Sequence, residues 1–210
     1  MISVCLPTRG LVFTEVEEAL SNNFEGKYDY KIYRSFNLPI PDCQNELVEK
    51  ALNDGATRIF FVEEDVVLPE NTLNKLILAD ADIACLDYGV EGWSCVTRAK
   101  KDNEILWCGL GATLIKREVF DVLEKPYFRQ DRLLLLNDWP EVKWVDAGEK
   151  ERYGGQDIYF CCMARDKGFK IVQIPGEARH LKLDKLGQPG VNKGLHEISQ
   201  KPPITKHQIL

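Results

Sequence analysis

Three acidic residues follow directly on an apolar stretch in the first third of the chain. Residues 59–62 are apolar, as in a buried strand, and the apolar residues 66–68 follow the acids and end at Pro69. The three acids are Glu63, Glu64 and Asp65. Carboxylates in such a setting are costly if they are buried without partners. We expect the strand to deliver them to the edge of a cleft, where a divalent cation such as Mg²⁺ or Mn²⁺ would neutralise them. The alternative is an acidic turn on a solvated surface.

Other residues that could do chemistry occur later in the chain. Asp157 follows two glycines and Gln156, which places a carboxylate in the first turn of a predicted helix, although aspartate there is also a common N-cap. His180 lies beyond the last predicted strand and, taken alone, is as compatible with a structural role. The residues Gly109 and Gly111 lack the third glycine of a dinucleotide-binding fingerprint, so close backbone packing is the competing explanation for them.

The elements that must position these residues alternate along the first half of the chain. Alternation of strands and helices predicts a mostly parallel sheet in a three-layer α/β fold. We predict strands at 2–6, 28–35, 59–62, 82–88, 93–98, 104–107, 109–115, 142–145 and 169–174. Helices are predicted at 14–22, 43–53, 70–78, 117–123 and 158–167. Residues 124–155 show little periodicity and are interpreted as a long loop region of the kind that is usually functional.

Composition indicates a water-soluble globular protein of 210 residues, which is long enough to bury a sizeable core. No apolar run approaches the ~20 residues of a membrane span, and the N-terminus resembles a strand more than a signal peptide. We therefore expect a cytoplasmic protein whose seven cysteines are reduced thiols. The net charge of −6 is uneven, because residues 178–210 carry +4 and the remainder −10. The division expected is one catalytic domain, 1–184, and a C-terminal tail or extension, 185–210.

The order of these motifs resembles the GT-A fold glycosyltransferases, particularly those of the family 2 type. The resemblance covers roughly residues 2–182. It includes the 63–65 acids with Pro69 as a counterpart of the "DxD" motif, a Gly-x-Gly strand before a short helix, the acidic motif at 154–157 and the late histidine. Two residues depart from the family pattern, because Glu63 replaces an aspartate and Gln156 replaces a glutamate.

The resemblance implies a GT-A-like domain with a Rossmann-like nucleotide-binding half and a metal-dependent transfer of a sugar to an acceptor hydroxyl. Its metal ligands would be Asp65, Glu63 and His180, and Asp157 would act as the general base in a reaction that inverts the anomeric centre. Donor binding would use Pro7, Thr8, Arg9, Asn45, Glu63, Glu64 and Lys182. Contacts to the acceptor or the sugar would come from Trp93, Gly109, Gly111 and Gln156.

The implied cofactors are Mn²⁺ or Mg²⁺ and a nucleotide-sugar donor, with a UDP-sugar favoured and a GDP-sugar possible. The acceptor is open: a glycan, a small molecule, or a polyanion such as modified DNA that the basic segment 178–210 would hold. Two rival functions are a nucleotidyltransferase and a non-catalytic nucleotide- or sugar-binding module of the same fold. The first usually carries a longer glycine-rich loop after the first strand than residues 7–10 provide, and the two departures named above favour the second.

Overall fold

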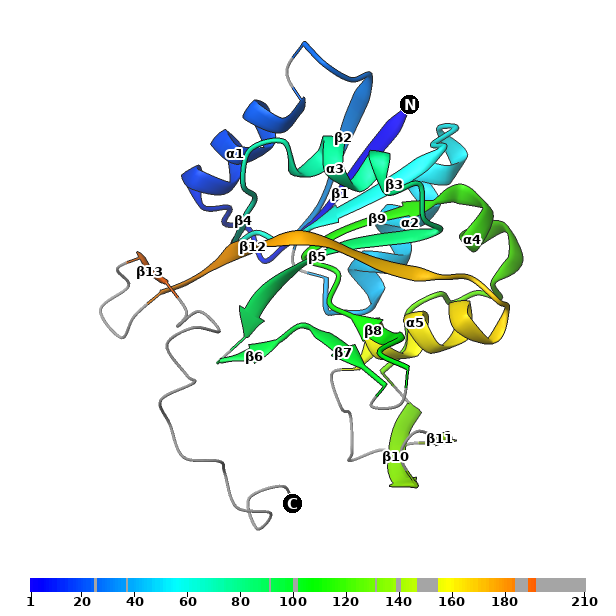
Figure 1. Ribbon diagram of the computed structural model, residues 1–210. Helices are drawn as coiled ribbons and strands as arrows, with labels where there is room; N and C mark the ends of the chain where they lie inside the picture. The colour runs from blue at the N-terminus through cyan, green and yellow to red at the C-terminus, as the bar shows by residue number, and fades with distance from the viewer. Residues whose placement is uncertain are drawn as a thin grey trace.

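The computed structural model describes residues 1–24, 26–36, 38–90, 92–99, 102–130, 132–138, 141–146, 155–183 and 189–191. The fold is a mixed sheet between two layers of helices (Figure 1). The central strands are β1 (Ile2–Thr8), β2 (Tyr30–Phe36), β3 (Arg58–Val62), β5 (Ile83–Val90), β9 (Ala112–Lys116) and β12 (Ile171–Leu183). The helices are α1 (Thr14–Phe24), α2 (Asp42–Asn53), α3 (Thr72–Leu78), α4 (Arg117–Val122) and α5 (Gln156–Asp166). The short strands are β4 (Val66–Val67), β6 (Trp93–Ser94), β7 (Val96–Arg98), β8 (Ile105–Cys108), β10 (Arg132–Asp138), β11 (Glu141–Asp146) and β13 (Pro189–Val191).

The central sheet confirms the predicted fold class. Its order is β13-β12-β5-β9-β3-β1-β2. The pairs β1–β2, β1–β3 and β5–β12 are parallel, and β9 pairs antiparallel with both β3 and β5. The five central strands other than β9 therefore share one direction, and their carboxyl ends meet along one edge of the sheet. That edge is where open α/β sheets bind ligands.

Two apolar clusters, one on each face of the sheet, hold the three layers together. One cluster joins α1 and α3 to the sheet through side chains such as Phe24, Leu73 and Phe60. The other joins α2, α4 and α5 through side chains such as Leu47 and Phe160. Strand residues alternate between the two clusters, as the two-residue period of a buried strand requires. The helices thus fix the sheet from both sides and leave its carboxyl edge open.

Two differences from the predicted elements bear on the site. The last central strand was predicted to end at 174, but β12 continues to Leu183, so His180 lies within a strand and not beyond one. The second difference is β4, a two-residue strand directly after the acids, which pairs antiparallel with the far end of β12. Residues 189–191, in the predicted tail, add β13 to the edge of β12.

None of the helices in the described part of the chain combines the length and the apolar character that a membrane span requires.

Candidate functional site

The acidic residues lie in the turn between β3 and β4. The backbone N–H of Val66 donates to the carbonyl of Glu63 at 3.2 Å, which closes the turn. The strand before it is buried, whereas Glu63 and Asp65 are only partly buried. The chain therefore leaves the core at this point, as the sequence predicts, and it presents these two carboxylates at the carboxyl edge of the sheet.

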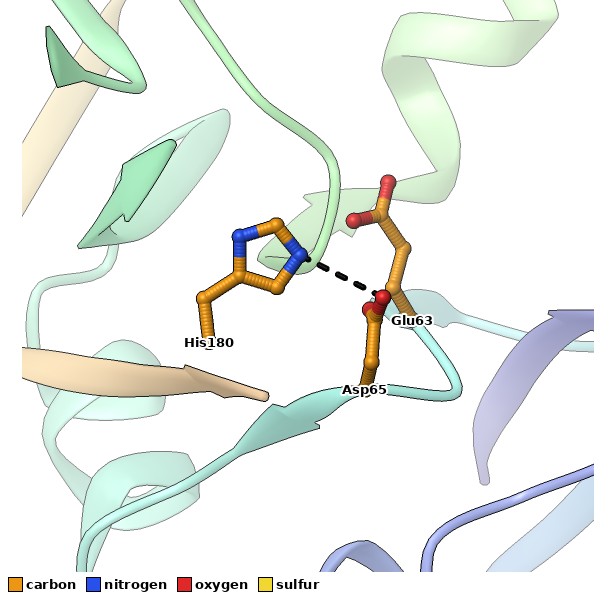
Figure 2. Close-up of side chains that lie close together, drawn as sticks. All are labelled: Glu63, Asp65 and His180. Atoms are coloured by element: carbon orange, nitrogen blue, oxygen red, sulfur yellow. Dashed lines mark ion pairs between the residues drawn. The ribbon is translucent and has the colours of Figure 1, made fainter. Parts of the chain in front are cut away.

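The pairing of β12 with β4 brings His180 to the acids. In this pairing His180 is the register partner of Val66, and the N–H of Leu181 donates to the carbonyl of Asp65 at 2.7 Å. The Nε2 atom of His180 then lies 3.3 Å from Oδ2 of Asp65 (Figure 2). One ligand atom from each of Glu63, Asp65 and His180 lies within 4.8 Å of the other two. The three residues predicted as metal ligands are thus neighbours in the fold.

The hydrogen bond on the other side of the imidazole fixes its orientation. Nδ1 of His180 lies 3.1 Å from the carbonyl oxygen of Gly89, which can only accept, so Nδ1 carries a proton. In the neutral ring, Nε2 would then direct its lone pair at the Asp65 carboxylate, and the two would repel. Either a proton on Nε2 or a cation between the two groups removes this conflict.

The pKa values of the cluster reflect burial and crowding. Burial raises the pKa of Glu63 to about 7, and the negative charges of Asp65 and Asp157 act in the same direction. For His180, burial lowers the pKa, but the hydrogen bond and the charge of Asp65 outweigh it, so the pKa is raised above its usual value. The cluster retains protons near neutral pH that a divalent cation would displace.

The donor set of the cluster fits a divalent metal ion. Two carboxylates and one imidazole form a site of hard oxygen ligands with one borderline nitrogen. Carboxylates suit Mg²⁺ and Mn²⁺, and imidazole is a common metal ligand, so these three residues could hold a divalent cation. Glu64 does not belong to the set, and both of its carboxylate oxygens are bonded to Arg9.

Glu64 holds the segment that follows β1. Its Oε2 accepts from the backbone N–H of Arg9 at 2.8 Å, and its Oε1 accepts from Nε of the same residue at 2.5 Å. The Arg9 side chain is nevertheless 84% exposed, and its two terminal nitrogens have no hydrogen bond within the described residues. The guanidinium is therefore anchored at one end and available to an anion at the other.

A pocket of about 250 Å³ lies between this arginine and the acids. The residues that line it are Pro7, Thr8, Arg9, Leu38, Ile40, Cys43, Glu63, Glu64 and Asp65. Five of the seven residues predicted to bind the donor are among them. Its lining combines apolar and charged side chains, as suits a ligand with a flat apolar ring and a phosphate chain.

Asn45, a further predicted donor contact, has another partner in the structure. Its Nδ2 donates to the carbonyl of Phe128 at 2.9 Å, and its Oδ1 accepts from the N–H of the same residue at 3.1 Å. It lies in a neighbouring pocket of about 390 Å³ that is separate from the first except for Ile40, which lines both. The structure thus explains Asn45 by its bond to a distant backbone segment. Its role in donor binding stays a prediction.

Asp157 lies in the first turn of α5. Its Oδ1 accepts from the N–H of Ile158 at 2.8 Å. Burial raises its pKa from 3.8 to about 6, although this hydrogen bond favours the charged form. The preceding Gln156 accepts a hydrogen bond from Gln130 at 3.3 Å, and Gln130 lines the larger pocket. The charge of Asp157 acts on Glu63, so the two carboxylates belong to one electrostatic cluster.

The remaining predicted contacts to acceptor, sugar or donor lie in three different settings. Gly109 and Gly111 precede β9 and pack against Tyr88, because an added Cβ would lie 2.4 Å and 2.8 Å, respectively, from its hydroxyl oxygen. Trp93 is 67% exposed on β6. Lys182 is an exposed residue of β12, two positions beyond His180. The contacts predicted for these residues stay predictions. The packing against Tyr88 gives a structural reason for both glycines.

Several residues at the site are not apparent from the sequence. Leu38, Ile40 and Cys43 line the smaller pocket, and Gly89 and Tyr88 contact the histidine ring from β5. Apolar residues after a strand and a tyrosine within one give no chemical signal by themselves. Only the pairing of the strands shows that these residues lie beside the acids.

Comparisons with known proteins bear on the fold. The solved structure of A197 from STIV matches with a TM-score of 0.61 and 19% sequence identity, over 91% of this chain and 94% of that chain. Two others have TM-scores too low to support an argument. One is assigned as a nucleotide-diphospho-sugar transferase from Desulfovibrio desulfuricans G20 (TM-score 0.43, 13% identity, 84% of this chain and 80% of that chain). The other is a nucleoside-diphosphate-sugar pyrophosphorylase from Vibrio cholerae RC9 (0.42, 10%, 84% and 92%).

No protein-family model matches the chain, and no curated protein sequence matches it. At 19% identity the likeness to A197 is one of fold alone.

Proposed function

We propose that this protein is a metal-dependent glycosyltransferase that moves a sugar from a nucleotide-sugar donor to an acceptor hydroxyl. The observation that carries the proposal is the cluster of Glu63, Asp65 and His180, which forms a metal-ligand set beside a pocket that exposes Arg9. The fold supports it, because the cluster and the pocket share the edge of the sheet where α/β proteins bind ligands. The resemblance of the motif order to GT-A enzymes of the family 2 type is the second support.

The smaller pocket would hold the nucleotide. Its apolar side chains Leu38 and Ile40 would face the base, and the free end of Arg9 would pair with the diphosphate. Mn²⁺ or Mg²⁺ would bind at Glu63, Asp65 and His180. When bound, it would act as a Lewis acid that neutralises the charge developing on the departing diphosphate. A UDP-sugar is the favoured donor, and a GDP-sugar is the alternative.

Asp157 would serve as the general base. A base works best when its pKa lies near the working pH, and burial already brings the pKa of this carboxylate to about 6. It would take the proton of the acceptor hydroxyl as the oxygen attacks the anomeric carbon. The carbon–oxygen bond to the diphosphate breaks in the same displacement, so the anomeric centre would invert.

Calorimetric binding of nucleotides tests the proposal. UDP, GDP and CMP would each be titrated into wild type and Asp65→Asn, with and without Mn²⁺. We expect one nucleoside diphosphate to bind only with the metal, and the substitution to abolish that binding. The matched control is Asp80→Asn, because Asp80 is an exposed carboxylate that pairs with Lys116 beyond the opposite end of β3. Metal-independent binding, or none in wild type, would contradict the metal-dependent transferase.

The products of turnover separate this function from its rivals. A glycosyltransferase moves the sugar from its donor to an acceptor, or more slowly to water, and releases a nucleoside diphosphate, whereas a nucleotidyltransferase consumes or releases pyrophosphate. A binding module releases neither product. Chromatography of the nucleotide after incubation with UDP-sugars and Mn²⁺ therefore distinguishes all three.

A further inference from the structure

Tyr88, on β5, contacts one candidate metal ligand, His180, and the backbone of Gly111, which pairs with another, Glu63. The side chain is buried, with 3% of the residue exposed. Its ring meets the imidazole of His180 edge to face, with 5.6 Å between the ring centroids and an angle of 78°. Its hydroxyl oxygen accepts a hydrogen bond from the N–H of Gly111 at 3.0 Å. The residue therefore supports the histidine with its ring and the start of β9 with its hydroxyl.

Gly111 connects this tyrosine to Glu63. The carbonyl of Gly111 accepts from the N–H of Glu63 at 3.3 Å, so the two backbones are paired. A Cβ on Gly111 would lie 2.8 Å from the Tyr88 hydroxyl oxygen and 2.9 Å from Oε2 of Glu63. Because no side chain intervenes at this position, the phenol and the carboxylate both approach the same α-carbon.

The hydroxyl of Tyr88 has a proton to donate. Within the described residues, no carbonyl or carboxylate accepts it, although the hydroxyl oxygen itself accepts from Gly111. A buried donor without an acceptor is unfavourable, and the Glu63 carboxylate is the acceptor that shares the space around Gly111.

We propose that Tyr88 is a positioning residue that orients Glu63 and His180 for a divalent cation. Its hydroxyl donates to one oxygen of the Glu63 carboxylate and leaves the second oxygen for the metal, while its ring restricts the tilt of the imidazole. Metal-ligating carboxylates are commonly oriented by such partners, whose loss weakens metal binding about 10- to 100-fold. The inference rests on the proposed metal site and assigns a new role within it.

The test is the Mn²⁺ affinity of Tyr88→Phe, measured by paramagnetic resonance of the unbound ion. This variant keeps the ring against His180 and removes only the hydroxyl. We expect Mn²⁺ to bind about 10- to 100-fold more weakly. In turnover assays the Mn²⁺ concentration at half-maximal rate should rise, while kcat at saturating Mn²⁺ stays within a few-fold of wild type.

The matched control is Tyr33→Phe. Tyr33 is also buried, and its hydroxyl donates to Asp54 at 2.8 Å, away from the acids. A double-mutant cycle with Glu63→Gln adds a readout that a merely structural tyrosine would not change. If the hydroxyl acts through Glu63, the two losses of Mn²⁺ affinity are not additive, whereas independent effects add.

A measurement on wild type tests the proposal without requiring that any variant folds. Addition of Mn²⁺ should perturb the ultraviolet absorbance of a buried tyrosine, and the same perturbation should remain in Tyr33→Phe. Wild-type Mn²⁺ affinity in Tyr88→Phe, or an unchanged tyrosine spectrum, overturns the role of Tyr88 and leaves the metal site intact. Absence of Mn²⁺ binding by wild type overturns both.

Discussion

Asp157 combines two features that a general base needs, a raised pKa and a place beside the acid cluster. The rise comes from burial, and the backbone N–H of Ile158 limits it by stabilising the charged form. The raised pKa of this carboxylate supports the proposed general base, and that role stays a prediction.

Asp157→Asn should lower kcat by about 10²- to 10⁴-fold, because general base catalysis typically contributes that much. Nucleotide binding should change little, since the residue does not line the smaller pocket. The wild-type rate should rise with pH through about 6 as the carboxylate loses its proton, and this dependence should vanish in the variant. Asp166→Asn, at the exposed end of the same helix, is the control. A wild-type rate in Asp157→Asn would exclude the assignment.

Between elements, the site depends on contacts that join distant segments. The pairing of β4 with β12 sets the distance between Asp65 and His180. The bond of Glu64 to Arg9 joins this turn to the end of β1. At the larger pocket, Asn45 joins α2 to the segment around Phe128. Each contact connects residues that are more than 50 positions apart in the chain.

Asn45→Ala tests whether this residue is structural or binds the donor. It removes two hydrogen bonds to the backbone of Phe128, and we expect the free energy of unfolding to fall by about 1–3 kcal/mol. Denaturant titration measures this loss. The control is Glu46→Ala on the same helix, whose ion pair with Lys50 lies at the surface and contributes little. Unchanged stability with weaker nucleotide binding would instead support the donor contact predicted from the sequence.

For the molecule as a whole, the site is a source of instability when no cation is present. Two carboxylates near one another, Glu63 and Asp157, have raised pKa values because burial disfavours their charged forms. A group whose pKa is higher in the folded state than in the unfolded state binds protons on folding. Protonation therefore stabilises the metal-free protein, and ionisation destabilises it.

The raised pKa values of Glu63 and Asp157 predict how the stability of the metal-free protein depends on pH. The stabilising effect of the protons is fully present below about pH 4, near the unfolded-state pKa values, and is lost as the pH rises through about 6 and 7. We expect the metal-free protein to melt at a lower temperature at pH 7.5 than at pH 5. In the double variant Glu63→Gln, Asp157→Asn, the melting temperature should change less with pH. Thermal melts across this pH range measure both.

Saturating Mn²⁺ should raise the melting temperature of wild type at pH 7.5, because an ion that binds only the folded state adds stability. Melting temperatures of wild type that do not change with Mn²⁺ would contradict a metal site in this cluster.

The sequence alone determined the fold class and identified the acidic residues of the candidate site. Alternation of apolar strands and helices predicted the three-layer α/β arrangement, because periodicity is a local property of the chain. The acids at 63–65 indicated a strand that leaves the core, since charged groups next to a buried run have few other places to go. The bonds of Glu64 to Arg9 were not apparent, because they join residues that lie far apart in the sequence.

The tertiary structure decided which residues meet. Arg179 and His180 of β12 pair with β4, more than 100 positions earlier in the chain, and no local pattern encodes that pairing. The approach of Tyr88 to Gly111 and the bond of Asn45 to Phe128 are likewise contacts between distant segments. Sequence patterns report what each segment buries, whereas the packing of segments against one another sets the distances on which a site depends.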